Sequence, residues 1–530
     1  MWHGHRCLRG VCLFDIEKWL AAISTYGHFD MTTKAFPKPN KRAGAAFPPL
    51  ISVKRDSARP LHRQIYDAFR AIIVARALTS GQPIPSTRAL AAELGISRIP
   101  VLNAYAQLLA EGYFEARVGA GTFISSSLPV EPTPTPDSSL PSHKATSASR
   151  RLARASLALP AYRRDPWLRH YGAFSVSQPA LDAFPLKAWA NLVARHGRNP
   201  LARALEYGNP MGLMRLREVI AVYLRTSRAV RCEPAQIMIV SGSQQALDIS
   251  ARVLLNPGNS VWVEEPGYWL ARHVLTAAGC RIIPVPVDSE GLDVAAGIQR
   301  CRTARAALVA PSHQFPLGVT MSASRRLQML QWARQSGSWI IEDDYDSEYR
   351  YESKPIASLQ GLDDSSRVIY VGTFSKVLFP SLRVGYLVIP PDLVDRFLPM
   401  RNAMDVGPPH LSQAVLADFI AEGHFARHIR KMRALYRERR NVLVDSLQRV
   451  CGSLLRVVGD RAGMYLAVTL PKTRNDREIA LRAAEQSLWL WPLSPTYIAK
   501  PAESGFILGF GSTTTAEIPA AVRHLHKLIS

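Results

Sequence analysis

Between residues 236 and 374, short runs rich in β-branched residues alternate with amphipathic helical patterns, and this alternation is the strongest constraint on the fold. The runs read QIMIVSG, SVWVEEP, RIIPVPV, AALVAPS, SWIIEDD and VIYVGTF. Helical patterns such as SQQALDISARVLL and SRRLQMLQWARQSG separate several of them. Because strands that alternate with helices over this length build βαβ units, the sequence predicts an α/β domain with a largely parallel sheet.

A segment of different composition divides the chain of 530 residues. Residues 128–165 are rich in Pro, Ser, Thr and Ala, and closely spaced prolines disfavour both helix and sheet, which is typical of an extended linker. We therefore expect a flexible linker at 128–165 between a domain at 46–127 and a larger α/β domain at 166–530. Residues 1–45 are expected to form a poorly ordered extension.

The chain carries a formal charge of +23 at pH 7. An excess of this size favours a polyanionic partner, because basic side chains release the counterions condensed on a nucleic acid. A generally basic surface is the alternative, and charge alone does not decide between them. No run of 18 or more apolar residues occurs, so we expect no membrane-spanning segment.

The six cysteines are scattered and include no CxxC pair, which favours a reducing compartment such as the cytoplasm. Near the amino terminus HGHRCLRGVC brings histidines and cysteines together. No second pair of ligands follows at the spacing of a zinc site, so we predict no metal site. The same region lacks a signal-peptide pattern, and the sequence leaves open whether translation starts at Met1 or Met31.

Residues 60–125 predict three helices followed by a hairpin. Apolar residues recur at helical spacing from Leu61, a second helix is expected to open at Ser86, and a third at Ser97, whose hydroxyl can cap it. Two helices joined by so short a turn are typical of a helix-turn-helix, whose second helix lies in the major groove of DNA. The run YFEARVGAGTFIS then predicts two strands around a tip with Gly119 and Gly121, the wing of a winged helix.

This block resembles the DNA-binding domain of GntR-type regulators, through the run PSTRALAAELGISR and the wing motif GAGTF. The resemblance implies phosphate or base contacts from the helix-turn-helix and a wing tip that enters the minor groove or contacts phosphates. The sequence departs from the family pattern at Ile99 and Pro100, where relatives usually have polar residues, and at Leu102, where many relatives have Arg. The residues expected at the interface with double-stranded DNA are Arg88, Ser97, Arg98, Asn103, Gly119, Gly121 and Thr122.

The stretch GTFSKVLFPSLR places Lys376 just after a β-rich run, between small hydroxyl residues and Arg383. A lone lysine usually extends into solvent or pairs with an acid. Here its neighbours supply what pyridoxal 5′-phosphate (PLP) requires, which is an amine, an acid for the ring nitrogen, a phosphate cradle and an aromatic plate. Ser375 and Thr373 add hydroxyl donors, and the planar guanidinium of Arg383 suits a dianion.

The remaining features occur in order along the chain. IVSGSQQAL is a strand, a glycine turn and a helix start, so the amides of Ser243 and Gln244 can bind a phosphate at the helix terminus. EEPGYWL presents Tyr268 after a strand, where its ring can stack. IIEDDYD ends an apolar strand with a cluster of carboxylates, at the edge of a parallel sheet where ligands bind, and an acid placed there suits a pyridinium nitrogen.

Residues 166–530 resemble fold-type I aminotransferases, and the whole chain resembles the MocR-like (PdxR-like) subfamily of GntR regulators. The matching motifs are YGNPMG at 207–212, GSQQAL at 242–247, EDDYDSE at 342–348 and GTFSK at 372–376. The resemblance implies a winged helix-turn-helix joined by a linker to a PLP-binding α/β domain, in a homodimer with head-to-tail exchange.

The same resemblance assigns roles to single residues. Lys376 is expected to hold PLP as an internal aldimine, and Asp343 to bind the ring nitrogen. Tyr345 is expected to bond the phenolic oxygen, together with His313 or Gln314. Tyr207 is expected to reach the phosphate in the neighbouring subunit. The residues expected to bind phosphate within one subunit are Ser243, Gln244, Ser375 and Arg383.

One position departs from the aminotransferase pattern. The late strand GFILGFG carries Ile507 where those enzymes hold an arginine for the substrate α-carboxylate, and an apolar side chain cannot replace a bidentate donor. Two interpretations follow: a transcription regulator that senses PLP, with or without a small amine or amino acid, and an active aminotransferase with an appended DNA-binding domain. The missing arginine and the complete winged helix favour the regulator. The sequence does not determine the promoter or the direction of regulation.

Overall fold

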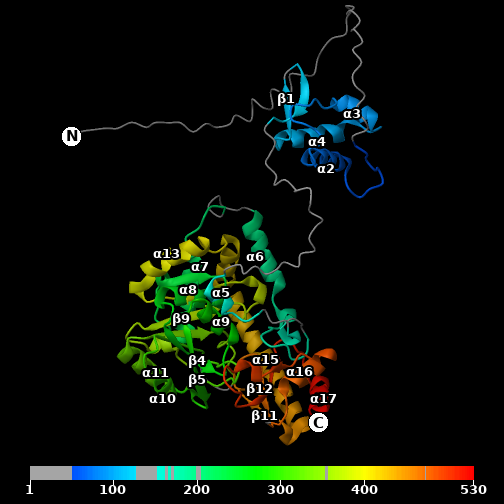
Figure 1. Ribbon diagram of the computed structural model, residues 1–530. Coiled ribbons are helices and arrows are strands. Elements are labelled where there is room, and N and C mark those ends of the chain that lie inside the picture. Colours follow the sequence, from blue (N-terminus) through cyan, green and yellow to red (C-terminus); the bar gives the residue numbers. More distant parts are fainter. Residues whose placement is uncertain are drawn as a thin grey trace, which may run out of the picture. The chain divides into compact units, whose positions relative to one another are not determined.

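The computed structural model describes residues 51–117, 119–126, 152–161, 165–168, 172–198, 205–351, 356–471 and 473–530. The chain divides into two compact units, Met1–Ala148 and Ser149–Ser530. Figure 1 labels their elements, and each unit is described by itself below. The extension expected at 1–45, with the His and Cys residues near the amino terminus, lies outside the described residues, as does most of the linker expected at 128–165.

The first unit is a winged helix-turn-helix, as predicted. Its elements are α2 (Leu61–Val74), α3 (Thr87–Glu93), α4 (Arg98–Ala110), β1 (Phe114–Arg117) and β2 (Gly121–Ile124). The Ser86 hydroxyl caps α3 by accepting a hydrogen bond from Ala89 N at 3.2 Å. Ser97 takes the extended backbone of a cap residue, but its hydroxyl makes no cap bond, so that part of the prediction is wrong.

Three aromatic rings hold this small unit together. Phe69 of α2, Tyr105 of α4 and Phe114 of β1 meet edge to face, with ring centroids 5.2–5.6 Å apart. Strands β1 and β2 pair antiparallel from Phe114 opposite Ile124 to Arg117 opposite Gly121. Gly119 and Gly121 have φ of +75° and +109°, a backbone conformation that only glycine adopts at low cost, so the turn of the wing depends on them.

A sheet of eight strands forms the centre of the second unit. In spatial order the strands are β3 (Ile237–Val240), β10 (Gly385–Val388), β9 (Val368–Thr373), β8 (Trp339–Asp344), β7 (Ala306–Val309), β4 (Ser260–Glu265), β5 (Arg281–Asp288) and β6 (Gly291–Leu292). Pairs from β9 through β5 are parallel, whereas β10 runs antiparallel to both neighbours and β6 antiparallel to β5. The predicted α/β sheet is confirmed, with two reversed strands.

Both faces of this sheet are buried, which explains its continuous apolar runs. In β9, Ile369 and Val371 belong to a core shared with α8 (Ser243–Leu254) and α13 (Val394–Asp405), whereas Val368 and Tyr370 pack on the opposite face.

The other helices of this unit are α5 (Arg154–Leu157), α6 (Leu186–Arg198), α7 (Met214–Arg228), α9 (Trp269–Ala277), α10 (Val294–Arg300), α11 (Ala323–Ser336), α12 (Leu359–Leu362), α14 (His410–Ala421), α15 (His424–Cys451), α16 (Asp476–Glu485) and α17 (Ile518–Ile529).

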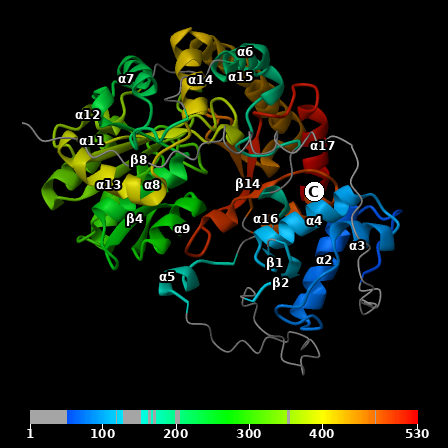
Figure 2. The same ribbon diagram turned by 90° about the horizontal axis from the view of Figure 1, so that it is seen from above.

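A second, antiparallel sheet follows the long helix α15. Its strands, in spatial order, are β11 (Arg456–Val458), β12 (Tyr465–Leu470), β14 (Ser504–Gly509) and β13 (Trp491–Pro492). Together with α16 and α17, which are orange to red in Figure 2, these strands gather at one end of the unit. Over the described residues, no helix is long and apolar enough to cross a bilayer.

Candidate functional site

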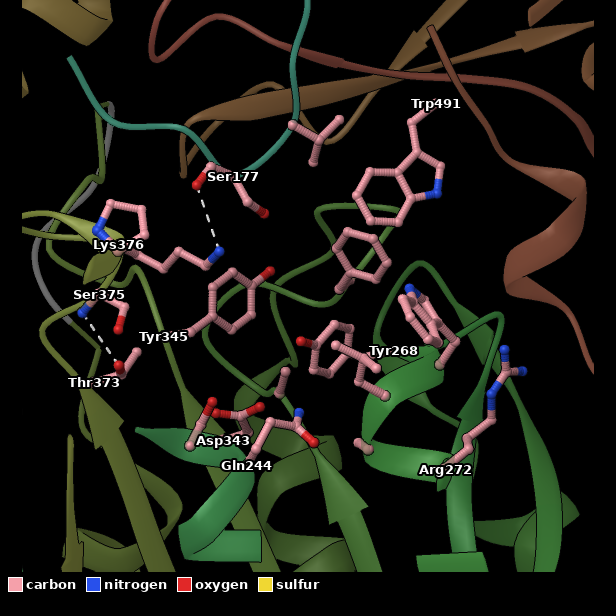
Figure 3. A pocket seen from close by; sticks show the side chains of 18 of the residues that line it. Ser177, Gln244, Tyr268, Arg272, Asp343, Tyr345, Thr373, Ser375, Lys376 and Trp491 are labelled. Atoms are coloured by element: carbon pink, nitrogen blue, oxygen red, sulfur yellow. Dashed lines mark hydrogen bonds between the residues drawn. The ribbon is translucent and has the colours of Figure 1, made fainter. Parts of the chain in front are cut away.

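A cavity of about 520 Å³ opens at the carboxyl ends of β4, β7, β8 and β9. This is the edge at which open α/β sheets bind ligands. Figure 3 shows part of its wall, with Lys376 on one side and Trp491 and Tyr268 on the other. The predicted cofactor residues that line the cavity are Ser243, Gln244, Tyr268, Asp343, Tyr345, Ser375, Lys376 and Arg383.

Lys376 extends into this cavity from the turn that follows β9. Its Nζ donates a hydrogen bond to the backbone carbonyl oxygen of Ser177 at 3.4 Å. Burial lowers the pKa of Lys376 to about 8, although the carboxylates of Asp346 and Asp343 oppose that shift. A lysine with such a pKa is partly neutral near physiological pH, and a neutral amine is a nucleophile.

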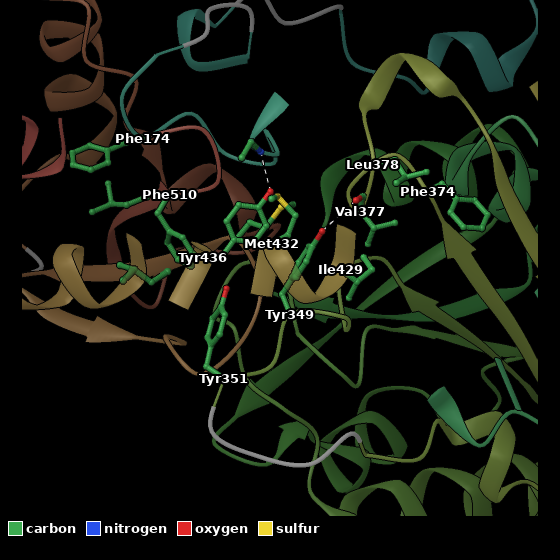
Figure 4. Close-up of a cluster of buried hydrophobic side chains, with 14 of the residues drawn as sticks. Phe174, Tyr349, Tyr351, Phe374, Val377, Leu378, Ile429, Met432, Tyr436 and Phe510 are labelled. Atoms are coloured by element: carbon green, nitrogen blue, oxygen red, sulfur yellow. Dashed lines mark hydrogen bonds between the residues drawn. The ribbon is translucent and has the colours of Figure 1, made fainter. Parts of the chain in front are cut away.

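The residues around Lys376 anchor it to the core. Phe374, Val377 and Leu378 are almost fully buried and belong to one apolar cluster with α14 and α15, seen in Figure 4. The Val377 carbonyl also accepts a hydrogen bond from the Tyr349 hydroxyl at 3.3 Å. Because its neighbours point into this cluster, the backbone of Lys376 is held in place while its side chain extends to the cavity.

Asp343, near the end of β8, provides a buried acid. Its Oδ1 is buried and has no hydrogen-bond partner among the described residues. Burial, together with the nearby carboxylates of Asp344 and Asp346, raises the pKa of Asp343 to about 7, although Lys376 opposes that shift. An unpaired buried carboxylate is costly, and a cationic ring nitrogen would remove that cost.

A second group of predicted site residues has the composition of an anion site. Helix α8 begins at Ser243, directly after Gly242, whose φ is +106°. A Cβ on Gly242 would lie 3.0–3.2 Å from the guanidinium of Arg383, so only glycine allows Arg383 to approach this helix terminus. The buried Ser375 Oγ has no partner among the described residues. A helix terminus, a guanidinium and a free hydroxyl together fit a phosphate.

Three aromatic residues complete one side of the cavity. The ring of Tyr268 meets that of Phe315 edge to face, with centroids 5.8 Å apart. The hydroxyl of Tyr345 donates to the His313 carbonyl at 2.7 Å and lies 2.7 Å from the Tyr465 hydroxyl. His313 is not part of the cavity wall: its Nδ1 lies 2.9 Å from Asp346 Oδ1, behind Tyr345.

Two further predicted positions lie away from the cavity wall. The side chain of Tyr207 is 90% exposed, and it is not among the residues that line the cavity. Ile507 is fully buried in β14, opposite Ala467 of β12 and Trp491 of β13, and it packs in a cluster with Phe315. Ile507 therefore supports the aromatic wall of the cavity from behind.

Sequence reasoning missed several residues of the cavity. Ser177 carries the carbonyl that accepts from Lys376, and its φ of +66° is unusual for a residue other than glycine. Trp167 and Trp491 reach the cavity from segments more than 300 residues apart, which no local motif signals. Phe315 directly follows a predicted residue, Gln314, in the run PSHQFPLG, but nothing in that run distinguishes it from an ordinary core residue.

In the first unit the predicted DNA contacts occupy exposed positions, except Thr122, which is half-buried. Arg88 lies in the first turn of α3, and Arg98 begins α4 and donates from Nε to Thr87 Oγ1 at 3.0 Å. Asn103 is exposed on α4. Gly119, Gly121 and Thr122 form the tip of the wing. The helix-turn-helix and the wing thus each present polar groups to solvent.

Comparison with known protein families separates the same two regions. Residues 61–124 match the bacterial regulatory proteins of the gntR family, and residues 173–525 match aminotransferase class I and II. The chain is 41% identical over 462 residues to the probable rhizopine catabolism regulatory protein MocR of Rhizobium meliloti, covering 87% of this chain and 92% of that protein. It is 30% identical to the pyridoxine biosynthesis transcriptional regulator PdxR of Corynebacterium glutamicum, covering 85% and 91%.

Solved aminotransferases share the fold of the second unit. Kynurenine aminotransferase of Pyrococcus horikoshii, in complex with PMP, is 27% identical, with a TM-score of 0.67 over 73% of this chain and 98% of its own. The multiple substrate aminotransferase of Thermococcus profundus is 26% identical, with a TM-score of 0.66 over 71% and 97%.

Fold and site together define a transcription regulator in which a helix-turn-helix domain is joined to an aminotransferase-like domain of fold type I. The chain belongs to the MocR-like family of GntR regulators. The resemblance stated from the motifs is thereby confirmed.

Proposed function

We propose that the second unit binds PLP in the cavity around Lys376 and that bound PLP alters the affinity of the first unit for double-stranded DNA. The observation that carries the proposal is the convergence of three groups in one cavity. These are the desolvated amine of Lys376, the buried Oδ1 of Asp343 without a partner, and the anion cradle at Gly242, Ser375 and Arg383.

Each group then has a definite task. When bound, PLP supplies an aldehyde and an electron-withdrawing pyridinium ring. Lys376, partly neutral because burial lowers its pKa, offers the amine for covalent attachment. Asp343 accepts a hydrogen bond from the ring nitrogen and keeps it charged. Ser243, Gln244, Ser375 and Arg383 hold the phosphate, Tyr268 stacks on the ring, and Tyr345 with His313 behind it faces the phenolic side.

We propose a homodimer with head-to-tail exchange as the working form. Tyr207 is highly exposed and lies away from the cavity wall of its own subunit, which supports a role in the neighbouring one. We further propose that the protein acts in the cytoplasm, that residues 1–45 form an extension, and that residues 128–165 act as the linker between the two domains.

A regulatory role is better supported than transamination. An aminotransferase needs a donor for the substrate α-carboxylate, and the position expected to supply one is Ile507, buried against aromatic side chains. PdxR is a regulator of pyridoxine biosynthesis, which supports PLP itself as the effector here. MocR is a probable regulator of rhizopine catabolism, which supports a second small molecule beside PLP.

The test is a DNA-binding titration of the full-length protein on the intergenic region next to its gene. It is run without PLP, with PLP, and with PLP plus candidate amines and amino acids, and Lys376→Ala serves as the matched protein. We expect PLP to change the dissociation constant of the wild-type protein and not that of the variant. Equal affinities in all conditions would refute PLP sensing, and steady turnover of an amino acid would favour the aminotransferase.

A further inference from the structure

The exposed face of helix α4 is aliphatic where a DNA-reading helix usually carries charge. Val101, Ala104, Tyr105 and Leu108 point into the core of the first unit. The opposite side exposes Ile99, Leu102, Asn103 and Ala106, which lie on one stripe because they are spaced three, four and seven residues apart. Ile99 is 67% exposed and Leu102 is 41% exposed.

Nothing described in the first unit covers this stripe. The core cluster of that unit includes neither Ile99 nor Leu102, and the partly buried apolar residues packed against that cluster include neither. Two large aliphatic side chains exposed side by side on one helix face suit contact with a partner. Their placement in the second helix of a helix-turn-helix identifies that partner, because this helix enters the major groove.

Cationic side chains flank the stripe. Arg98 precedes Ile99 at the start of α4, and Arg88 lies in the first turn of α3. Arg55 donates to the carbonyl of Gly95, in the turn between the two helices. This arrangement is complementary to the major groove of a DNA duplex. The base edges on the groove floor would face the aliphatic stripe, and the phosphates on either side would face the guanidinium groups.

We propose that Ile99 and Leu102 read thymine by contact with its 5-methyl group and that Asn103 reads adenine. The thymine methyl is the apolar feature that base pairs present in the major groove, and the amide of Asn matches adenine N6 and N7. The bidentate contact of Arg with guanine is absent from this stripe. The half-site read by α4 therefore has A·T pairs at its centre, with Arg88 and Arg98 placed toward phosphates. This inference rests on DNA binding by the first unit.

The test uses the full-length protein on duplexes selected from a random library. Selected sequences should share an A·T core. Each contacted thymine is then replaced by uracil, which pairs identically but lacks the methyl group. Loss of one buried methyl contact should weaken binding about fourfold. Uracil at thymines outside the core serves as the control and should have no effect.

The protein side completes a double-mutant cycle. Ile99→Ala should weaken binding to the thymine duplex and make no further difference on the duplex that lacks the corresponding methyl. Leu109→Ala, which removes an exposed leucine near the end of the same helix, is the matched control and should bind as wild type. Leu102→Arg should shift the selected base at its position toward guanine.

Three results would overturn the proposal: a selected core of G·C pairs, equal binding of the uracil and thymine duplexes, or additive effects of Ile99→Ala and uracil. In each case DNA binding itself persists, so these outcomes differ from a failure of the first unit to bind DNA. A protein partner for the stripe would appear as Ile99→Ala binding DNA normally on all duplexes.

Discussion

Lys376 Nζ lies 3.4 Å from the backbone carbonyl oxygen of Ser177, across a separation of 199 residues. Ser177 has a φ of +66°, a left-handed conformation that costs about 1–3 kcal/mol for a residue other than glycine. Arg383, which also lines the cavity, has a positive φ too, +50°. Among the described residues, two of the eight non-glycine residues with a positive φ thus line the cavity, where strained backbone can hold side chains in position.

Lys376→Ala should abolish covalent attachment of PLP and leave the fold intact, because the side chain extends into a cavity and not into the core. The measurement is borohydride reduction followed by mass spectrometry of the peptide around residue 376. Lys527→Ala, on the exposed side of α17, is the control and should retain the adduct. A reduced adduct in Lys376→Ala would show that another amine is the point of attachment.

Asp343 predicts a pH-dependent effect of PLP on stability. Burial raises the pKa of Asp343 from 3.8 to about 7, so the ligand-free folded state keeps this proton longer than the unfolded state. Its stabilising contribution is present below about pH 4 and is lost as the pH rises through about 7. A bound pyridinium offsets that loss, so the gain in melting temperature on adding PLP should grow between about pH 6 and 8.

The variant Asp343→Asn tests whether the carboxyl of Asp343, and not another acid of the region, causes this pH dependence. The amide does not titrate, so the thermal gain from PLP should vary less with pH than in the wild type. Loss of a charge-assisted hydrogen bond of about 1.5–3 kcal/mol should also weaken PLP binding roughly 10- to 100-fold. If the variant showed the wild-type pH profile, the titrating group would be a different one.

Gly242→Ala should damage the phosphate cradle. Its new Cβ would lie 3.0–3.2 Å from the Arg383 guanidinium. Gly258→Ala is a matched control, because Gly258 also has a positive φ, +88°, but a Cβ added there would have no other atom within 4 Å. Both variants should lose about 1–3 kcal/mol of unfolding free energy. Only Gly242→Ala should lose affinity for PLP, and equal affinities of the two would remove Arg383 from the cradle.

Tyr207 allows a test of the exchanged dimer by subunit mixing. If Tyr207 serves the neighbouring subunit, Tyr207→Phe and Lys376→Ala homodimers each have two defective sites. A mixed dimer would have one site with both residues intact and one site with neither. Co-expression of differently tagged subunits should therefore restore normal PLP affinity at one site per mixed dimer. No restoration would place Tyr207 outside the partner's cavity.

Arg88→Ala should weaken DNA binding and reduce its salt dependence. One phosphate contact contributes about 0.9 to the slope of log affinity against log salt. The slope should fall by roughly that amount, whereas Arg482→Ala on α16 of the second unit should leave it unchanged. A wild-type slope for Arg88→Ala would exclude this residue from the phosphate contacts.

The local sequence pattern was sufficient to predict most of the strands and helices. Six apolar runs became strands of the large sheet, and the turn at Gly242 became the start of α8, because strand and helix formation depend on periodicity and on nearby turn residues. Motifs of five to seven residues were also sufficient for the family, since each groups several chemically specialised residues at fixed spacing.

The antiparallel direction of β10 could not be predicted from the sequence. Its residues GYLV are as apolar as those of the parallel strands, because both faces of the sheet are buried. The capping role predicted for Ser97 was wrong, because several residue types tolerate a cap position without making the bond.

By itself the sequence determined the order of the elements, the division between a winged helix and an α/β domain, and the residues Lys376, Asp343 and Arg383 as candidates for one site. Only the tertiary structure decided that Ser177, Trp167 and Trp491 share the cavity with them, and that His313 lies behind Tyr345. The physical reason is that local propensity acts over a few residues, whereas a cavity wall is assembled by packing between segments that lie hundreds of residues apart.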